Sequence, residues 1–356
     1  TNHAITISGG GKNSATYASI GFYNDAGWTI ADKVSRFTAN VKNTFYISDK
    51  FTATLTTQAN VRSQKAPGTM PQRKNNTLGV FERDFDINPF SYALGTSRTL
   101  RPYNEDGSLE YYRNNWAPFN IFNEYDNNKM NISVLDFKVQ GEGTYRLNQN
   151  MAIKALLSMR QAYTSTTHEV HEGSNIVQAF RANENPFVAQ QNIYLVRDND
   201  NPQLQPKVGL THGGILNKTE ASLKSFLARI AFDFDKRINN HDLKAFVFTE
   251  LRSAERTVNP FQGYGIQYDR GNQIYTNPLI FNKLINEGNS YFNLQNRYDR
   301  GITFSFNGTY GYAGKYVFNM VLNCEGSNTS GKGARVLWLP TWNVGAKWNI
   351  DQEEFM

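Results

Sequence analysis

Apolar and polar residues alternate with a period of two in many short segments of this chain, most clearly near its end. In residues 316–325, one face is formed by Tyr316, Phe318, Met320 and Leu322. The opposite face of that segment carries polar residues such as Asn319, Asn323 and Glu325, and residues 341–350 repeat the pattern. Alternation at this period predicts strands whose two faces meet different surroundings.

The same pattern, bounded by turn residues, predicts about eleven strands. We expect them at residues 3–9, 16–24, 36–46, 51–61, 135–147, 151–161, 225–235, 243–252, 301–312, 316–325 and 341–350. The facing of residues 243–252 cannot be assigned from the pattern. The chain is therefore expected to be all-β and antiparallel.

The connections between these strands are unequal in length. Short turns alternate with connections that are mostly long, above all residues 62–130, 163–220 and 253–298. The first long connection is rich in aromatic residues and is expected to be an ordered, packed loop; they are Phe81, Phe85, Phe90, Tyr92, Tyr103, Tyr111, Tyr112, Trp116, Phe119 and Phe122. Short periplasmic turns and long extracellular loops are typical of outer-membrane β-barrels. A soluble β-sandwich also produces alternating strands, but it gives no reason for all long loops to lie at one end.

An odd number of strands with free first and last strands does not close into a barrel. Because unpaired backbone groups in lipid cost several kcal/mol each, the segment is expected to be an arc of a larger transmembrane barrel. The chain starts at Thr1 without Met or a signal segment and stops soon after a strand, so we expect a piece of a longer protein.

The composition argues against several other classes of protein. No apolar run is long enough for a transmembrane helix, and the single Cys324 forms no internal disulfide. The net charge of +6 comes from scattered lysines and arginines without a basic block, so nucleic-acid binding is not expected.

Two segments contain residues that bind metals in other proteins. In residues 168–172, His168 and His171 are three residues apart in a predicted solvated loop, whereas the zincin motif places its histidines four apart on a helix. Residues 198–201 begin like a calcium loop, but Pro202 and Gly209 occupy positions where ligands belong. We expect no metal and no cofactor.

Two glycine segments are predicted to be turns. Residues 9–12 lack the Ser or Thr and the following helix of a phosphate-binding loop, and Asp106-Gly107 is typical of a hairpin turn. Nothing in the sequence brings serines, histidines and acids together as a catalytic group, so the protein is not expected to be an enzyme.

The best candidate ligand-binding residues lie in the first long connection. They are Tyr111, Tyr112, Arg113, Trp116 and Phe119. Aromatic faces stack on sugars or peptide side chains, and Arg pairs with carboxylates. The alternative is that these rings only pack the loop or contact a protein partner.

Three groups of residues resemble the SusC/RagA-like TonB-dependent outer-membrane transporters of Bacteroidetes-type bacteria. They are NHAITISGG with ATYASIGFYNDAGW near the start, RPYNEDGS with YYRNNWAPFNIFNE in the first long connection, and YVFNMVLNCEGSN with WLPTWNVGAKWNIDQEEFM at the end. The last is the most specific of the three. It departs from the usual family pattern at residues 323–326, which replace an Arg-rich lead into Asp-Gly, and at Leu339-Pro340, which replaces Phe-Pro.

The resemblance covers essentially the whole chain but only part of a family member. It implies that residues 1–356 are part of a plugged barrel of about 22 strands, with the N-terminal plug and the remaining strands absent. It also implies a place in the outer membrane of a Gram-negative bacterium and contact with its lipid. Import of glycans, oligosaccharides or peptides with a SusD-like lipoprotein, driven by the TonB system, is the implied function. The competing hypothesis is a soluble or surface-attached β-rich binding protein resembling an adhesin.

Overall fold

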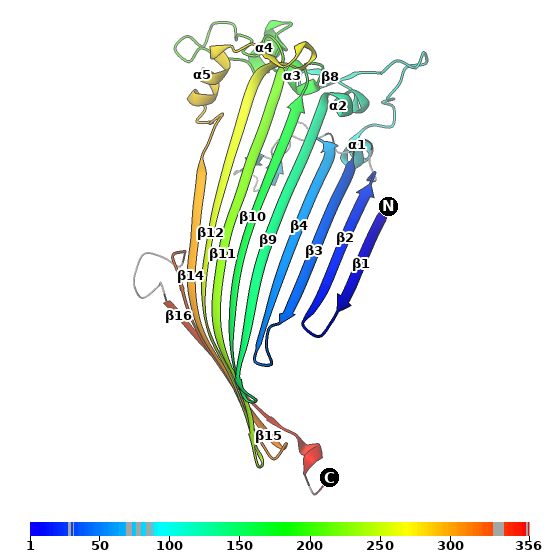
Figure 1. Ribbon diagram of the computed structural model, residues 1–356. Coiled ribbons are helices and arrows are strands. Elements are labelled where there is room, and N and C mark those ends of the chain that lie inside the picture. Colours follow the sequence, from blue (N-terminus) through cyan, green and yellow to red (C-terminus); the bar gives the residue numbers. More distant parts are fainter. Residues whose placement is uncertain are drawn as a thin grey trace.

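The computed structural model describes residues 1–27, 30, 32–68, 73–75, 80–82, 87, 89–329, 338–353 and 355. One large antiparallel sheet dominates this part of the chain (Figure 1). Its strands are β1 (Asn2–Gly10), β2 (Ser14–Asp25), β3 (Lys33–Tyr46), β4 (Phe51–Pro67), β9 (Asn128–Asn148), β10 (Met151–Val170), β11 (Gly214–Ile238), β12 (His241–Gln267), β14 (Gln295–Tyr312), β15 (Tyr316–Ser327) and β16 (Trp338–Trp348). Each pairs with the next in chain order, and β13 (Gln273–Ile274) pairs with β12 beside this path. The predicted arc of about eleven antiparallel strands is confirmed.

The remaining elements are short. They are β5 (Arg73–Asn75), β6 (Val80–Glu82), α1 (Pro89–Gly95), β7 (Tyr112–Asn114), β8 (Ala117–Phe119), α2 (Ile121–Asn127), α3 (Asn175–Ala179), α4 (Pro186–Gln191), η1 (Tyr268–Arg270), α5 (Pro278–Asn286) and η2 (Ile350–Gln352). No helix among the described residues has the length and apolar character needed to cross a membrane. Some residues used in the sequence analysis lie outside the described part of the chain, namely Trp28, Phe85, Glu354, Met356 and the side chains of Phe81 and Phe90.

The connections differ at the two ends of the sheet. At one end, hairpin turns of two to four residues join β1 to β2, β3 to β4, β9 to β10, β11 to β12 and β14 to β15. At the other end, the connections from β4 to β9, from β10 to β11 and from β12 to β14 are long, and their helices α2, α3, α4 and α5 gather at the top of Figure 1. The predicted asymmetry is confirmed. The predicted glycine turn after β1 is also confirmed, since the Gly11 amide donates to the Ser14 carbonyl at 2.8 Å.

The concave face of the sheet is polar and crossed by ion pairs. Arg160 donates two hydrogen bonds to Asp136 on the neighbouring strand, at 2.9 and 2.6 Å, and Lys154 Nζ lies 2.5 Å from Asp233 Oδ2. The same arrangement joins Arg229 to Glu250, Arg256 to Asp299 and Arg252 to Glu325. Cross-strand pairs of opposite charge are favourable neighbours in a sheet, and they give this face a nearly balanced charge.

The opposite face is apolar and exposed. Register rows such as Ile153–Phe232–Val247–Phe306–Leu322–Trp342 run across six strands. Phe304 is 47% exposed and Trp342 is 76% exposed. A soluble monomer rarely exposes an apolar surface of this extent, which therefore needs a covering.

The facing of β12 is settled by contacts on the concave side. The Phe248 ring lies 4.9 Å below the Arg229 guanidinium, and the Phe246 ring lies 5.9 Å from Lys154 Nζ. Both rings are on the polar face, while Val247 and Leu251 are exposed on the apolar face. Large apolar residues on both faces remove the alternation, which is why the sequence pattern gave no facing for residues 243–252.

Several strands are longer than the pattern predicts. β11 has 25 residues and β12 has 27, and β10 continues to Val170. The prediction of a solvated loop at His168 and Glu169 is therefore wrong, because both lie in β10 and His168 is buried. These extensions carry Ser, Thr and charged residues on both faces, so no period-two signal marks them.

The buried core lies where the long connections pack on the ends of β10, β11 and β12, and not between two sheets. Its larger cluster joins Ala117, Val170, Ile176, Val177, Ala179, Phe180, Leu210, Ile215, Tyr264 and Ile280. A β-sandwich would instead bury one face of its strands against a second sheet. The sandwich alternative does not fit this distribution of buried residues.

Candidate functional site

The first and second long connections form a joint scaffold at one end of the sheet. A second buried cluster, formed by Ile87, Phe119, Ile121 and Tyr125, gathers the first connection around its own aromatic rings. Phe119 lies 5.3 Å from Tyr112 and 6.2 Å from Tyr92, measured between ring centroids. The prediction of a packed loop is confirmed for Phe119 and the rings packed around it, whereas Tyr103 and Tyr111 are exposed.

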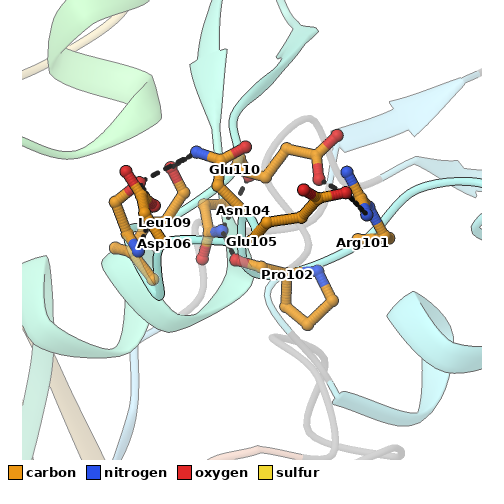
Figure 2. Close-up of polar contacts among 9 residues, drawn as sticks. Arg101, Pro102, Asn104, Glu105, Asp106, Leu109 and Glu110 are labelled. Atoms are coloured by element: carbon orange, nitrogen blue, oxygen red, sulfur yellow. Dashed lines mark hydrogen bonds and ion pairs between the residues drawn. The ribbon is translucent and has the colours of Figure 1, made fainter.

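The segment RPYNEDGSL forms a closed turn (Figure 2). Tyr103 and Leu109 are paired as an isolated bridge, and Gly107 at the tip has a φ of 84°. Asp106 accepts hydrogen bonds from both the amide and the hydroxyl of Ser108, at 2.9 and 2.6 Å, and these bonds lower the pKa of the Asp106 carboxyl. The predicted turn at Asp106-Gly107 is confirmed.

Arg101 and Asn120 hold this turn against the rest of the connection. Arg101 Nε lies 3.2 Å from Glu110 Oε2, as Figure 2 shows. The fully buried Asn120 donates to the carbonyls of Pro102 and Glu110, both at 2.8 Å, while its Oδ1 caps α2 by accepting from Phe122 N. One side chain therefore satisfies both the helix start and the base of the turn.

Asn175 fastens the second connection to the first. Its Nδ2 lies 2.8 to 3.1 Å from the carbonyl oxygens of Asn114, Ala117 and Pro118, which belong to the β7–β8 hairpin. Asn175 is 1% exposed, so its side chain is buried where the two connections meet. Buried polar groups with several partners fix a single arrangement, and here they fix two long loops relative to each other.

Glu124 lies at the same junction. Its carboxylate accepts from Asn175 N at 2.9 Å, from Asn123 Nδ2 at 3.1 Å and from Asn128 Nδ2 at 2.9 Å. No basic side chain among the described residues forms an ion pair with it, and burial raises the pKa of the Glu124 carboxyl to about 7. The sequence analysis missed both Glu124 and Asn175, because single polar residues in an aperiodic segment carry no signal of burial.

The predicted ligand-binding residues divide into two groups. Phe119 is buried and Tyr112 packs on it, so their rings belong to the loop core. Tyr111 is 47% exposed and donates to Asn123 Oδ1 at 3.3 Å. Arg113 is exposed, lies 3.3 Å from Glu184 of the second connection, and donates to the Trp116 carbonyl at 3.1 Å.

Trp116 occupies an unfavourable backbone position. Asn115 and Trp116, the two residues between β7 and β8, have φ values of 49° and 65°. A two-residue hairpin of this kind favours Asn at its first position and Gly at its second, so Trp there costs about 1–2 kcal/mol. The ring contacts Tyr194 of the second connection edge-on, with 5.8 Å between centroids. A bulky ring held at a position suited to glycine is a candidate for a functional role.

The other sequence candidates do not form a metal site. His168 Nε2 lies 3.3 Å from Asn128 Oδ1, and His171 stacks on Tyr268 at 4.4 Å. Asp198 Oδ1 accepts from the amides of Asp200 and Asn201 in a local turn. Among the described residues, no group of three or more His, Cys, Asp or Glu could hold a metal ion.

The concave face of the sheet contains a polar hollow of about 730 Å³. It is lined mainly by β3, β4, β9, β10 and β11 and includes Arg36, Asn60, Asp136, Lys138, Arg160 and Arg229. Arg36 and Lys138 line the hollow and form no ion pair within the described part of the chain, so its lining has more positive than negative charge near β3 and β9.

At the short-turn end, Glu353 ties the chain after β16 to the preceding hairpin. It accepts hydrogen bonds from Lys315 Nζ at 2.8 Å, Trp348 Nε1 at 3.0 Å and Tyr316 Oη at 2.9 Å. The Lys315 bond is the largest of the effects that lower the pKa of the Glu353 carboxyl to about 2. The closing Glu of the family-like motif therefore has a structural role here.

Comparison with known proteins supports the fold. No protein-family model and no curated protein matches the sequence. Among solved structures, the chain is similar to the RagAB peptide importer in its 'closed-closed' state, with a TM-score of 0.68 and 15% identity over 99% of this chain and 34% of that one. The 'open-open' state gives a TM-score of 0.65 at 14% identity, covering 98% and 33% of the two chains.

A more distant similarity is to the unliganded ferric citrate transporter FecA, with a TM-score of 0.51 and 6% identity over 97% of this chain and 37% of that one. The chain thus spans about a third of the length of the structures that it matches. These matches confirm the fold implied by the sequence resemblance: the chain has the fold of an arc of a SusC/RagA-like transporter β-barrel.

Proposed function

We propose that this chain is part of an outer-membrane TonB-dependent importer. Two features of the sheet support the proposal. One face is apolar and exposed while the other is concave and polar, and the longest connections all lie at one end of the sheet. In this proposal the apolar face contacts lipid, the concave face lines the lumen, the long connections are extracellular and the short turns are periplasmic.

The height of the apolar face agrees with a bilayer. On the apolar face of β14, Arg300 and Tyr312 are separated by twelve residues, and the residues facing outward between them include Ile302, Phe304, Phe306 and Tyr310. At about 3.4 Å per residue and a tilt of about 40°, this stretch spans about 31 Å along the membrane normal. That is the thickness of a hydrocarbon core. Tyr312, Tyr316 and Trp348 pair in one register row at its lower boundary, as an aromatic girdle requires.

The imported substrate is proposed to be a peptide, a glycan or an oligosaccharide, captured together with a SusD-like lipoprotein at the extracellular loops. TonB would supply the energy through an N-terminal region outside this chain. The similarity to the RagAB peptide importer supports the peptide class, and the sequence resemblance supports both classes. The joint scaffold of the first two connections offers a fixed surface for such a partner.

Loss of uptake tests the proposal. Deletion of the full-length gene is expected to abolish growth on the substrate mixture, peptide or glycan, that the protein imports, and expression of the intact gene is expected to restore it. Deletion of TonB should give the same defect. If the deletion strain takes up every tested mixture normally but attaches less well to surfaces, the adhesin-like alternative would be correct instead.

Within this function, we propose that Tyr111, Arg113 and Trp116 contact the substrate. Tyr111 and Arg113 are exposed, and the half-buried Trp116 is held at the positive-φ position of the hairpin between them and the second connection. Tyr112 and Phe119 are proposed to support them from the loop core.

Trp116→Gly is expected to change loop stability by less than about 1 kcal/mol. Relief of the positive-φ strain, about 1–2 kcal/mol, offsets the lost edge-on contact with Tyr194, about 0.5–1.5 kcal/mol. Substrate affinity of the full-length protein should nevertheless fall, as measured by calorimetric titration. Phe187→Ala, which removes a 69% exposed ring from α4, is the control and should leave affinity unchanged. Equal affinities for wild type and Trp116→Gly would exclude Trp116 from the site.

A further inference from the structure

The apolar face of the sheet is hollowed along its last strands. A groove of about 740 Å³ lies across β10 to β16, lined on the apolar face by residues such as Val247, Phe304, Phe306, Leu322, Cys324 and Trp342. Its walls are large rings, whereas Cys324 and Pro340 are small and share the register row of Phe304. The alternation of small and large side chains therefore leaves a groove in this part of the apolar face.

A second hollow of about 600 Å³ continues the groove toward the long connections. Its apolar lining includes Phe226, Leu251, Ile302 and Trp338. Trp338 stacks on Phe304 with 6.2 Å between centroids, and a Cβ on Gly326 would lie only 2.9 Å from its ring. Gly326 therefore lets the Trp338 ring lie against the sheet and form a wall of the hollow. Phe304 lines the first hollow, and Ile302 and Arg300 line the second on the same face of β14. The two hollows therefore adjoin at the Phe304–Trp338 contact, and together they are called the channel.

A basic residue stands at the upper end of this channel. Arg300 lines the second hollow together with Asn328, and its backbone is fixed because Arg300 N donates to Asn328 Oδ1 at 2.7 Å and Asn328 N donates to the Arg300 carbonyl at 3.1 Å. The Arg300 guanidinium forms no ion pair with any described residue and is exposed. The nearest register row above it on the same face holds Lys224 and Glu255, so the local charge remains positive.

The length of the channel fits one leaflet of a membrane. Phe306 lies six positions along β14 from Arg300. At about 3.4 Å per position and a strand tilt of about 40°, the two residues are about 15 Å apart along the membrane normal. This is half of a hydrocarbon core of about 30 Å. An acyl chain that starts at the level of Arg300 would therefore end near the bilayer midplane, beside Phe306 and Trp342.

From this geometry we infer that the channel binds a phosphorylated acyl lipid of the outer leaflet. One acyl chain lies between the rings of Phe304, Trp338 and Trp342, and a headgroup phosphate pairs with Arg300. The charge-assisted pairing is what distinguishes this lipid from the other lipids around the barrel. The inference rests on the membrane placement proposed above, and it adds a specific lipid site to it.

Lipid titration of the full-length protein tests the site. The protein is placed in phosphatidylcholine nanodiscs and titrated with diphosphoryl lipid A or with its dephosphorylated form, and binding is counted by native mass spectrometry. Arg300→Gln is expected to weaken binding of the phosphorylated lipid about fivefold and to leave the dephosphorylated lipid unchanged. Arg300→Lys should keep most of the preference. Cys324→Trp, which fills the groove, should weaken both lipids.

The control is Arg270→Gln, which removes an equal charge from an exposed arginine at the same end of the sheet but outside the channel. If Arg300→Gln behaves like this control, or if Cys324→Trp binds both lipids as the wild type does, the lipid site is wrong. Full competition by inorganic phosphate would show a free-anion site and also overturn it. A protein that does not enter nanodiscs at all would instead contradict the membrane placement.

Discussion

Phe304→Arg is expected to destabilise the protein folded in a bilayer by about 2–4 kcal/mol. Phe304 faces the apolar side of β14, is 47% exposed there and stacks on Trp338. It is two residues from Phe306 on the same face of β14, and the proposed placement puts Phe306 near the bilayer midplane. A charged residue on the lipid face of a barrel costs this much at the midplane and less near the interfaces. The measurement is the denaturant-dependent folding of the full-length protein into lipid vesicles.

Thr303→Arg is the matched control for this prediction. Thr303 faces the concave side and is paired in register with Glu250 of β12 and Glu325 of β15. An arginine there meets acidic neighbours and a polar surface, so its cost should be well below that of Phe304→Arg. Equal costs at the two positions would contradict a lipid-facing side. A larger cost at Thr303 would mean that the two faces are exchanged, since a shift of one residue moves every side chain to the other face.

The second large effect is a dependence on pH of the stability of the junction between the first and second long connections, where Glu124 is buried. Burial raises the pKa of Glu124 from 4.5 to about 7. The folded junction therefore holds this proton at pH values where the unfolded chain has lost it. The stabilising contribution is complete below about pH 4.5 and is lost progressively as the pH rises toward 7. A rise of this size in the pKa of Glu124 corresponds to about 3 kcal/mol in the stability of the junction.

Glu124→Gln should remove this pH dependence, because the amide stays neutral and its oxygen can still accept from Asn175 N. The junction is followed by hydrogen exchange of the Asn175 amide between pH 5 and 8 in the full-length protein. Wild type should exchange more readily as the pH rises, beyond the intrinsic increase, and the variant should follow the intrinsic increase alone. Glu184→Gln removes an exposed carboxylate of the second connection and serves as the control. A variant with the wild-type profile would show that another group titrates.

The sequence by itself determined the part of the sheet in which apolar and polar residues alternate. Residues such as Phe304 and Thr303 alternate because neighbouring positions on a strand face opposite sides, one apolar and one polar. The hairpin turns followed from residues such as Gly11 and Asn240 between two such patterns. The unequal connections and the resemblance of the last strands then indicated a barrel arc of the correct family fold.

The tertiary structure alone decided the parts of the sheet that lie outside these alternating segments. The upper ends of β10 and β11 carry Ser, Thr and charged residues on both faces among a few apolar ones, so they show no clear period of two and His168 was misplaced in a loop. On β12, Phe248 and Phe246 contact Arg229 and Lys154 on the polar side, and these tertiary contacts resolved its facing.

In the candidate site, residue types alone could not separate Phe119, which is buried, from Tyr111, which is exposed. The joining of two loops by Asn175 and Glu124 depends on contacts between residues 51 positions apart in the chain. The alternation of residue types along a strand indicates which surroundings each face of that strand meets. They do not record which distant polar groups become buried together, and that is the information the loops required.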